Sequence, residues 1–234
     1  MSGHSKWATT KRQKAIVDAK KGAIFAKLGK LIAIAARQGN DPTANFSLRL
    51  AMDKARQANM PKDNIERAIK RGTGELAGAQ IEELIYEGLG PAKAQFIVKI
   101  LTDNKNRAAA EIRHLFSDSG GSLGAVMWNF ELKGVLRITN LENDENFELD
   151  LIDNGAQDII KEEKGMTIYA KPEDLQKIKL FLEAKNIATE SAEIEYVAKD
   201  SLELSSEDKN KVQNFINELE SNEDVSDYYT NANL

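Results

Sequence analysis

Residues 59–75 read NMPKDNIERAIKRGTGE, and they separate two kinds of sequence. Pro61 suits the first turn of a helix, and the acidic Asp63 and Glu66 lie near the positive end of that helix. Two basic residues precede Gly72, which we expect to end it. The spacing before this helix is helical, whereas the sequence after it alternates with the period of a strand.

Two further helices are predicted upstream. The first begins at about Ala15, ends at the turn 39–42, and carries one apolar stripe made of Ile24, Leu28, Leu31 and Ala35. The second covers about 44–58, with inward positions at Leu48, Ala51, Met52 and Ala55. Residues 1–14 are small, polar and basic without an apolar period, so we expect a mobile arm.

Downstream of Gly74 the pattern predicts strands. Residues 80–87 and 94–102 form a hairpin, and a helix over 105–117 follows. Residues 119–124, SGGSLG, are expected to be a loop, and Val126, Trp128 and Phe130 alternate as in a strand. The tail predicts a helix that begins at Ser205 or Ser206 and a strand near 224–230, which could complete the same sheet.

The intervening segment predicts a second α/β unit. Its order is strand, helix, two strands, helix, strand, which is the split βαβ arrangement of ferredoxin-like domains. The elements are expected at 135–139, 146–153, 156–161, 166–170, from Pro172 through Leu182, and 189–198. The sequence therefore predicts an α+β fold: a basic helical domain at 1–75, a second domain at 76–132 and 200–234, and an inserted ferredoxin-like domain at 133–199.

Charge is distributed very unevenly along the 234 residues. Residues 1–74 carry 16 Lys and Arg against 5 Asp and Glu, whereas residues 75–234 carry 16 against 32. A basic segment on an acidic body favours a polyanionic partner. The plainer alternative is a solvated basic face without a ligand.

Composition argues against catalysis. The chain has no cysteine, and its two histidines, His4 and His114, are too few and too far apart to predict a metal site. No nucleophile elbow or phosphate-binding P-loop is present in the sequence. We therefore expect a non-enzyme without cofactor, metal or small-molecule substrate. We find no apolar run long enough for a membrane span and no secretory signal, and we expect a cytoplasmic protein.

The candidate binding residues are the cations of the basic domain and one aromatic residue beside them. Cations neutralise phosphates without reading sequence, and an aromatic ring can stack on an unpaired base. Trp7 could equally pack on its own helices. The predicted nucleic-acid contacts are Lys6, Trp7, Lys11, Arg12, Lys14, Lys20, Lys21, Lys27, Lys62, Lys70 and Arg71.

Two polyanions fit these residues. The helix after Pro61 could read the major groove of DNA, but the two acids in its first turns would repel the backbone there. A basic arm with one aromatic residue fits structured RNA at least as well. Ribosomal RNA and duplex DNA both stay open as partners, as does a protein-interaction adaptor that binds no nucleic acid.

Several motifs together closely resemble the YebC/PmpR family, which includes the mitochondrial translational activator of cytochrome c oxidase subunit I. They are GHSKW at 3–7, AIVDAKKG at 15–22, the stretch at 59–75, YEGLGP at 86–91, TDNKNRAAAEIRHLF at 102–116 and YTNA at 229–232. The resemblance implies three domains, the third inserted into the second, and a bacterial cytoplasmic member. It implies either a DNA-binding transcriptional regulator or a ribosome-associated factor that helps synthesis through difficult stretches such as consecutive prolines.

Overall fold

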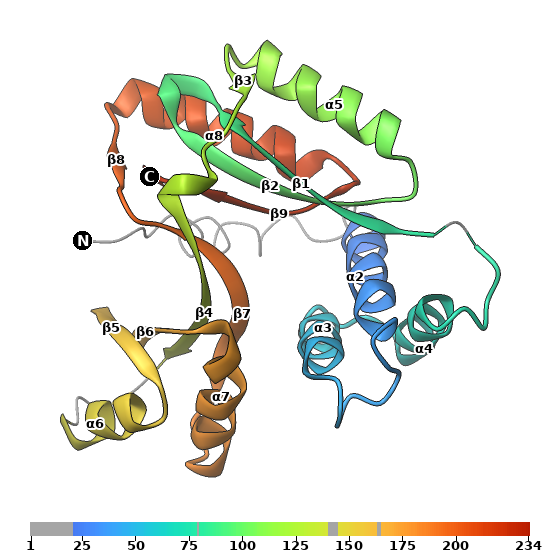
Figure 1. Cartoon of the computed structure of the whole chain (residues 1–234), viewed down its shortest axis with the longest axis vertical. Coiled ribbons are helices and arrows are strands. Elements are labelled where there is room, and N and C mark those ends of the chain that lie inside the picture. Colours follow the sequence, from blue (N-terminus) through green and yellow to red (C-terminus); the bar gives the residue numbers. More distant parts are fainter. Residues whose placement is uncertain (1–20, 79, 140–144, 163–164) are drawn as a thin grey trace. The chain divides into compact units, whose positions relative to one another are not determined.

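The computed structural model describes residues 21–234 except 79, 140–144 and 163–164. They form two compact units (Figure 1). The first unit contains the residues up to Phe130 together with Ala198–Leu234, and the second contains Glu131–Val197. The chain therefore leaves the first unit once and returns to it.

Three helices open the first unit: α2 (Lys21–Ala36), α3 (Phe46–Gln57) and α4 (Lys62–Gly72). The Asn45 side chain caps α3 by accepting the Leu48 N–H at 3.0 Å, and its amide group donates to the Ala35 carbonyl at 2.8 Å. Alanines make up half of the buried core residues between these helices, and Leu, Ile and Met make up the rest. The predicted apolar stripe needs one correction, because Ile24 is exposed.

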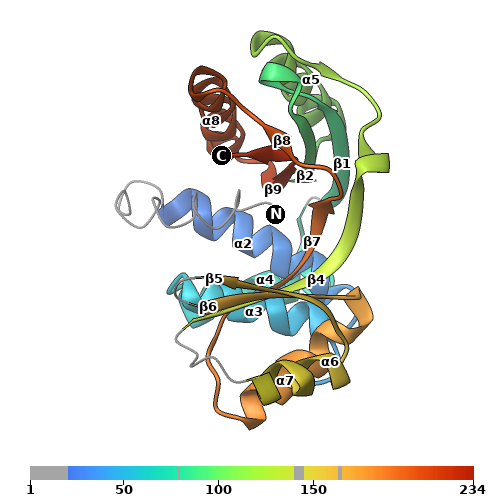
Figure 2. The same cartoon turned by 90° about the vertical axis from the view of Figure 1, so that its left-hand side faces the viewer.

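A four-stranded antiparallel sheet follows in the same unit, in the order β3-β1-β2-β9. Helices α5 and α8 cover one of its faces, as Figure 2 shows. The bounds are β1 Glu82–Leu89, β2 Gln95–Thr102, α5 Lys105–Asp118, β3 Ser122–Leu123, α8 Ser206–Ser221 and β9 Val225–Thr230. The C-terminal helix and strand thus add to the sheet that the β1–β2 hairpin begins.

Strand β2 is buried on both faces. Phe96 on one face meets the rings of Phe116 from α5 and Phe215 from α8 edge-on, with centroids 6.5 and 5.0 Å away. On the other face, Leu101 clusters with Ala33 of α2. The central strand therefore has α5 and α8 on one side and α2 on the other.

The strand predicted through residues 126–130 is wrong in its first half. Residues Met127–Asn129 form a 3₁₀ turn, and β4 (Phe130–Thr139) begins only after it. The Glu87 carboxylate accepts the N–H groups of Val126 and Met127, both at 2.6 Å, which fixes the turn. Trp128 is 64% exposed rather than alternating into a core.

Two short pairings were also missed by the pattern. Within the expected loop 119–124, β3 pairs with Gly88 and Leu89 of β1. Near the C-terminus, β8 (Leu202–Glu203) and β10 (Ala232–Asn233) form a parallel pair. Two-residue strands leave no period to detect in a sequence.

The second unit is a sheet in the order β5-β6-β4-β7 with α6 and α7 on one face (Figure 2). Phe147 of α6 stacks on Phe181 of α7 at 6.2 Å. The bounds are α6 Glu145–Asp153, β5 Ala156–Glu162, β6 Gly165–Ala170, α7 Leu175–Ala184 and β7 Thr189–Ala198. Strand β6 lies between β5 and β4, so the predicted split βαβ arrangement is confirmed, and with it the α+β class.

None of the helices in the described residues combines the length and the apolar character that a membrane crossing requires.

Candidate nucleic-acid interface

Most of the predicted contact residues fall outside the described part of the chain. These are Lys6, Trp7, Lys11, Arg12, Lys14 and Lys20. The predicted arm at 1–14 falls outside it as well, and all of these stay predictions. The five remaining residues lie on two helices: Lys21 and Lys27 on α2, and Lys62, Lys70 and Arg71 on α4.

Lys27 is held inside the first unit. Its ammonium donates to the Glu220 carbonyl at 2.7 Å, in the last turn of α8. Carbonyls in the last turn of a helix lack intrahelical donors and attract cations. Burial lowers the pKa of Lys27, and the nearby carboxylates of Glu220 and Asp227 only partly offset that effect. The Lys27 side chain thus stabilises the junction between α2 and α8.

A buried carboxylate, Asp224, joins the helices to the sheet. Its side chain is 4% exposed and accepts hydrogen bonds from Lys30 at 2.6 Å, Arg107 at 2.8 Å and Thr102 at 2.9 Å. Burial by itself raises the pKa of Asp224, but the hydrogen bonds from Lys30, Arg107 and Thr102 outweigh it and hold the pKa below its usual range. The carboxylate is therefore ionised at neutral pH and links three separate elements.

Residues next to Asp224 in the sequence also contact lysines of the basic domain. Lys30 also donates to the Glu223 carbonyl at 3.2 Å, and Lys54 of α3 lies 3.7 Å from the carboxylate of Asp227. We call residues 220–227 the acidic segment. Three lysines of the basic domain, one of them Lys27, face this segment, so they neutralise charge within the chain.

Helix α4 presents its cations differently. Lys62 is 88% exposed and lies 3.5 Å from Glu66 one turn along. Arg67 and Lys70 are exposed and pair with no carboxylate among the described residues. Arg71 is exposed in the last turn. We call Lys62, Arg67, Lys70 and Arg71 the α4 cations; they lie on the surface that α4 leaves uncovered.

Arg67 was missed in the sequence, although a signal for it existed. It precedes Lys70 by three positions and Arg71 by four, the spacing that places side chains on one face of a helix. The opposite face of α4 is buried through Ile65 and Ala68. A helix with one apolar and one basic face could have been read directly from these positions.

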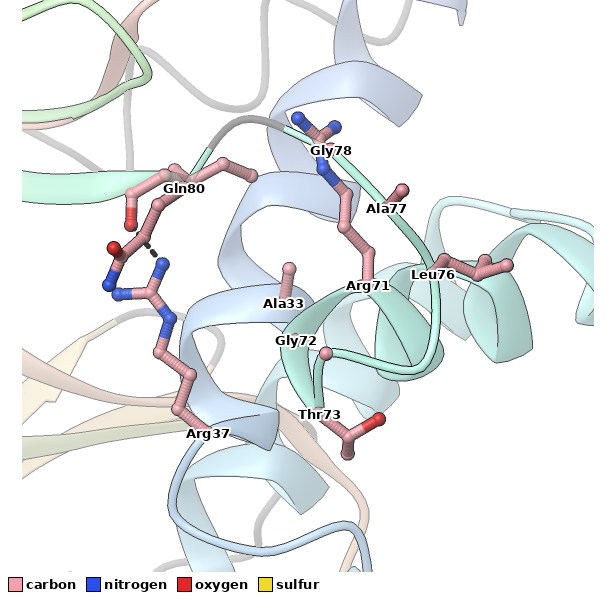
Figure 3. A pocket seen from close by; sticks show the side chains of 11 residues that line it. Ala33, Arg37, Arg71, Gly72, Thr73, Leu76, Ala77, Gly78 and Gln80 are labelled. Carbon is pink, nitrogen blue, oxygen red and sulfur yellow. Dashed lines mark hydrogen bonds between the residues drawn. The ribbon is translucent and has the colours of Figure 1, made fainter.

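A pocket of about 420 Å³ opens at the end of α4 (Figure 3). Arg37 and Arg71 lie on its two sides, and the Arg37 guanidinium donates to the Ile81 carbonyl. Gly72 lets α4 approach α2, since a Cβ there would lie 2.2 Å from the Ala33 carbonyl oxygen. Arg37 is a second residue absent from the predicted contacts, and only the folded chain brings it beside Arg71.

His114 and the Gly-rich loop have structural explanations. The His114 Nδ1 lies 2.9 Å from the Asp118 carboxylate, and both side chains are exposed, so they form a surface pair on α5. In the loop, a Cβ on Gly121 would lie 2.1 Å from the Leu89 carbonyl oxygen, which requires glycine for close packing. Among the described residues, no cluster of three or more acidic or histidine side chains could hold a metal ion.

Comparison with known proteins identifies the chain. A family model described as the TACO1/YebC protein N-terminal domain matches residues 5–75, and a second, described as the TACO1/YebC second and third domain, matches residues 81–232. This chain belongs to the TACO1/YebC family. The resemblance to the YebC/PmpR family noted in the sequence is thereby confirmed.

Relatives in the TACO1/YebC family align over the full length. A protein of Caldanaerobacter subterraneus subsp. tengcongensis is 46% identical over 240 residues, covering 100% of this chain and 99% of the relative. One from Dehalococcoides mccartyi is also 46% identical over 240 residues, covering 100% of this chain and 95% of the relative. Both relatives are named probable transcriptional regulatory proteins.

A solved structure shares the fold of this chain. The crystal structure of a conserved hypothetical protein from Aquifex aeolicus aligns with a TM-score of 0.82 and 40% sequence identity. The alignment covers 93% of this chain and 92% of the Aquifex chain. The architecture described above is therefore also found in this crystal structure.

Proposed function

We propose that this chain is a non-enzymatic regulator of gene expression that binds nucleic acid through the α4 cations and the basic residues that precede α2. The contrast between two sets of cations carries the proposal. Lys27, Lys30 and Lys54 are engaged by the acidic segment, whereas the α4 cations lie on an uncovered surface. Exposed cations can neutralise phosphates and release counterions. We leave Lys27 out of the proposed contact set for this reason.

We further propose that the nucleic acid is structured RNA, with a ribosome-associated role in translation. Readers of the major groove contact base edges with the N-terminal residues of a recognition helix. In α4 the exposed Asp63 lies in the first turn, while Lys70 and Arg71 lie in the last turn. This distribution suits contacts to a phosphate backbone better than insertion of the helix N-terminus into a groove.

The alternative is a DNA-binding transcriptional regulator. It rests on the names of the relatives, which are called probable transcriptional regulatory proteins. The two functions use the same cations, so they are separated by competition. A translation factor is displaced by ribosomal RNA and not by duplex DNA, while a DNA regulator keeps a preferred duplex in excess non-specific competitor.

The test is a binding titration of the full chain with a labelled structured RNA and a duplex DNA of equal length, at several salt concentrations. Replacing Arg67, Lys70 and Arg71 with Ala should weaken binding roughly 30-fold and reduce the slope of log affinity against log salt by about 2. A matched variant that loses the exposed Arg113, Lys171 and Lys177 controls for net charge. Equal losses in both variants would contradict the proposed interface.

A second measurement addresses the cellular partner. The full chain is followed through a sucrose gradient of cell lysate at low and moderate salt. Co-migration with ribosomes that fades with salt and is lost in the triple α4 variant supports the translation role. A protein that remains at the top of the gradient and yet retards one preferred duplex supports the DNA alternative and overturns the RNA proposal.

A further inference from the structure

The charged side chains that line the pocket at the end of α4 are all cationic. It lies where the C-terminal ends of α2 and α4 meet the segment leading into β1 (Figure 3). The described lining residues are Ala33, Arg37, Arg71, Gly72, Thr73, Gly74, Leu76, Ala77, Gly78, Gln80 and Ile81. Two of them are arginines and none is acidic, so the charged side chains lining it are both cationic.

Arg37 is anchored yet retains donors. One of its terminal nitrogens donates to the Ile81 carbonyl, which holds the side chain against the start of the sheet domain. Arg37 pairs with no carboxylate in the part of the chain that the structure describes. A guanidinium carries five N–H donors, so others stay available to a ligand.

Arg71 reaches the pocket from the last turn of α4. Its side chain runs beside Gly78, where an added Cβ would lie 3.2 Å from Nε and 3.7 Å from the guanidinium carbon. Figure 3 shows the guanidinium of Arg71 next to Gly78 and that of Arg37 next to Gln80. Glycine at position 78 therefore leaves the room that the Arg71 side chain occupies.

The nearby helix end does not oppose an anion as strongly as a bare helix C-terminus would. Free carbonyls there carry partial negative charge. Here the carbonyls of Ile69, Lys70 and Arg71 accept the N–H groups of Thr73, Leu76 and Gly74. These bonds pair the three carbonyls with N–H groups of the turn that follows α4.

We propose that this pocket binds a phosphate group between Arg37 and Arg71, the source being a phosphodiester of the bound nucleic acid. Planar guanidinium groups match the oxygen geometry of phosphate and bind it with charge-assisted hydrogen bonds. Arg71 also belongs to the α4 cations, so a phosphate held here continues the proposed contact surface. The inference rests on the proposed function for the identity of the phosphate, while the pocket itself is defined by its own residues.

Three single variants of the full chain test the pocket, each checked for folding by its thermal midpoint. Arg71→Gln removes a pocket cation, and Lys70→Gln removes the adjacent cation that does not line the pocket. Gly78→Ala keeps every charge, and its Cβ, 3.2 Å from the Arg71 Nε, requires the Arg71 side chain to shift by a few tenths of an ångström. We expect RNA affinity to fall about fivefold in Arg71→Gln and about twofold in both Lys70→Gln and Gly78→Ala.

Inorganic phosphate is the second probe. Titrated against the full chain at constant ionic strength, it is followed through the Nε–H resonances of the arginine side chains. If Arg37 and Arg71 shift together in the millimolar range, the pocket also accepts free phosphate. If they shift only with RNA, the phosphodiester source is supported.

The outcomes separate the two proposals. If the unmodified chain binds RNA but Arg71→Gln matches Lys70→Gln and Gly78→Ala has no effect, the pocket is overturned and the proposed function stands. If neither RNA nor duplex DNA binds, the proposed function fails. The phosphate titration then decides the pocket alone: a shared shift of Arg37 and Arg71 keeps it as a free-phosphate site, and no shift overturns it.

Discussion

Two groups of cations in the basic domain have opposite environments. Lys27, Lys30 and Lys54, on α2 and α3, face the acidic segment 220–227 at 2.6–3.7 Å. The α4 cations are exposed. Both groups add to the positive charge of residues 1–74, but the first group faces the acidic segment, whereas the second lies on the exposed surface of α4. Net charge in a segment therefore overstates the surface that a polyanion can use.

The largest effect is expected when α4, which carries the exposed cations, is forced away from α2, which carries Lys27 and Lys30. Gly72→Ala places a Cβ 2.2 Å from the Ala33 carbonyl oxygen and 2.8 Å from the Ala36 Cβ, so α4 must move away from α2. We expect the free energy of unfolding to fall by about 3 kcal/mol. Chemical denaturation measures it, and Gly22→Ala, where an added Cβ meets nothing within 4 Å, is the control. Equal stability of the two variants would contradict the packing.

The next largest loss of stability is expected from a change at Asp224, which accepts hydrogen bonds from one of the engaged lysines, Lys30. Asp224→Ala removes the buried acceptor shared by Lys30, Thr102 and Arg107. We expect unfolding to become easier by about 2–3 kcal/mol, because the half-buried Lys30 loses its partner while the more exposed Arg107 is rehydrated. RNA affinity should stay within about twofold of the unmodified chain. A large loss of affinity at unchanged stability would mean that the acidic segment belongs to the binding surface.

The same carboxylate gives a pH dependence. Because the folded chain holds the pKa of Asp224 below its usual range, the unfolded chain binds its proton more readily. The stabilisation is therefore complete above the ordinary aspartate pKa of about 3.9 and is lost as the pH falls through the lower folded value. Denaturation of the unmodified chain and of Asp224→Asn should differ by a constant amount above about pH 5 and converge below about pH 4. A difference that grows on acidification would contradict the assigned direction.

The smallest change in stability is expected from Lys62, one of the exposed α4 cations. Lys62→Ala breaks an exposed pair with Glu66 one turn along α4. We expect the free energy of unfolding to change by no more than about 0.5 kcal/mol. RNA affinity should fall about twofold, as for the loss of one peripheral phosphate contact. A stability loss comparable to that of Asp224→Ala would remove the distinction between the two groups.

Local sequence signals predicted most of the secondary structure. Helix α4 was predicted by Pro61 and Gly72, and the helix expected over 105–117 is α5, Lys105–Asp118. The 3₁₀ turn at 127–129 was not predictable in this way, since Glu87 fixes it from about forty positions away. Local periodicity predicts where helices and strands form. Contacts between residues that are distant in the sequence cause the departures from that prediction.

The residues of the candidate site show the same difference between local and long-range contacts. The exposed cations Lys62, Lys70 and Arg71 could be predicted, because one amphipathic helix determines which of its faces meets solvent. The engagement of Lys27 could not, since its acceptor, the Glu220 carbonyl, lies 193 positions away. Arg37 likewise joins Arg71 at the pocket only after α2 and α4 pack together.

Lysine acetylation footprinting most directly tests the difference between the lysines engaged by the acidic segment and the exposed α4 cations. The full chain is acetylated with and without structured RNA and analysed by mass spectrometry. We predict that Lys62 and Lys70 react readily in the free chain and become protected by RNA. Lys27 and Lys30, engaged by the acidic segment, should react slowly in both states. Protection of Lys27 and Lys30 by RNA, with Lys62 and Lys70 equally reactive in both states, would contradict it.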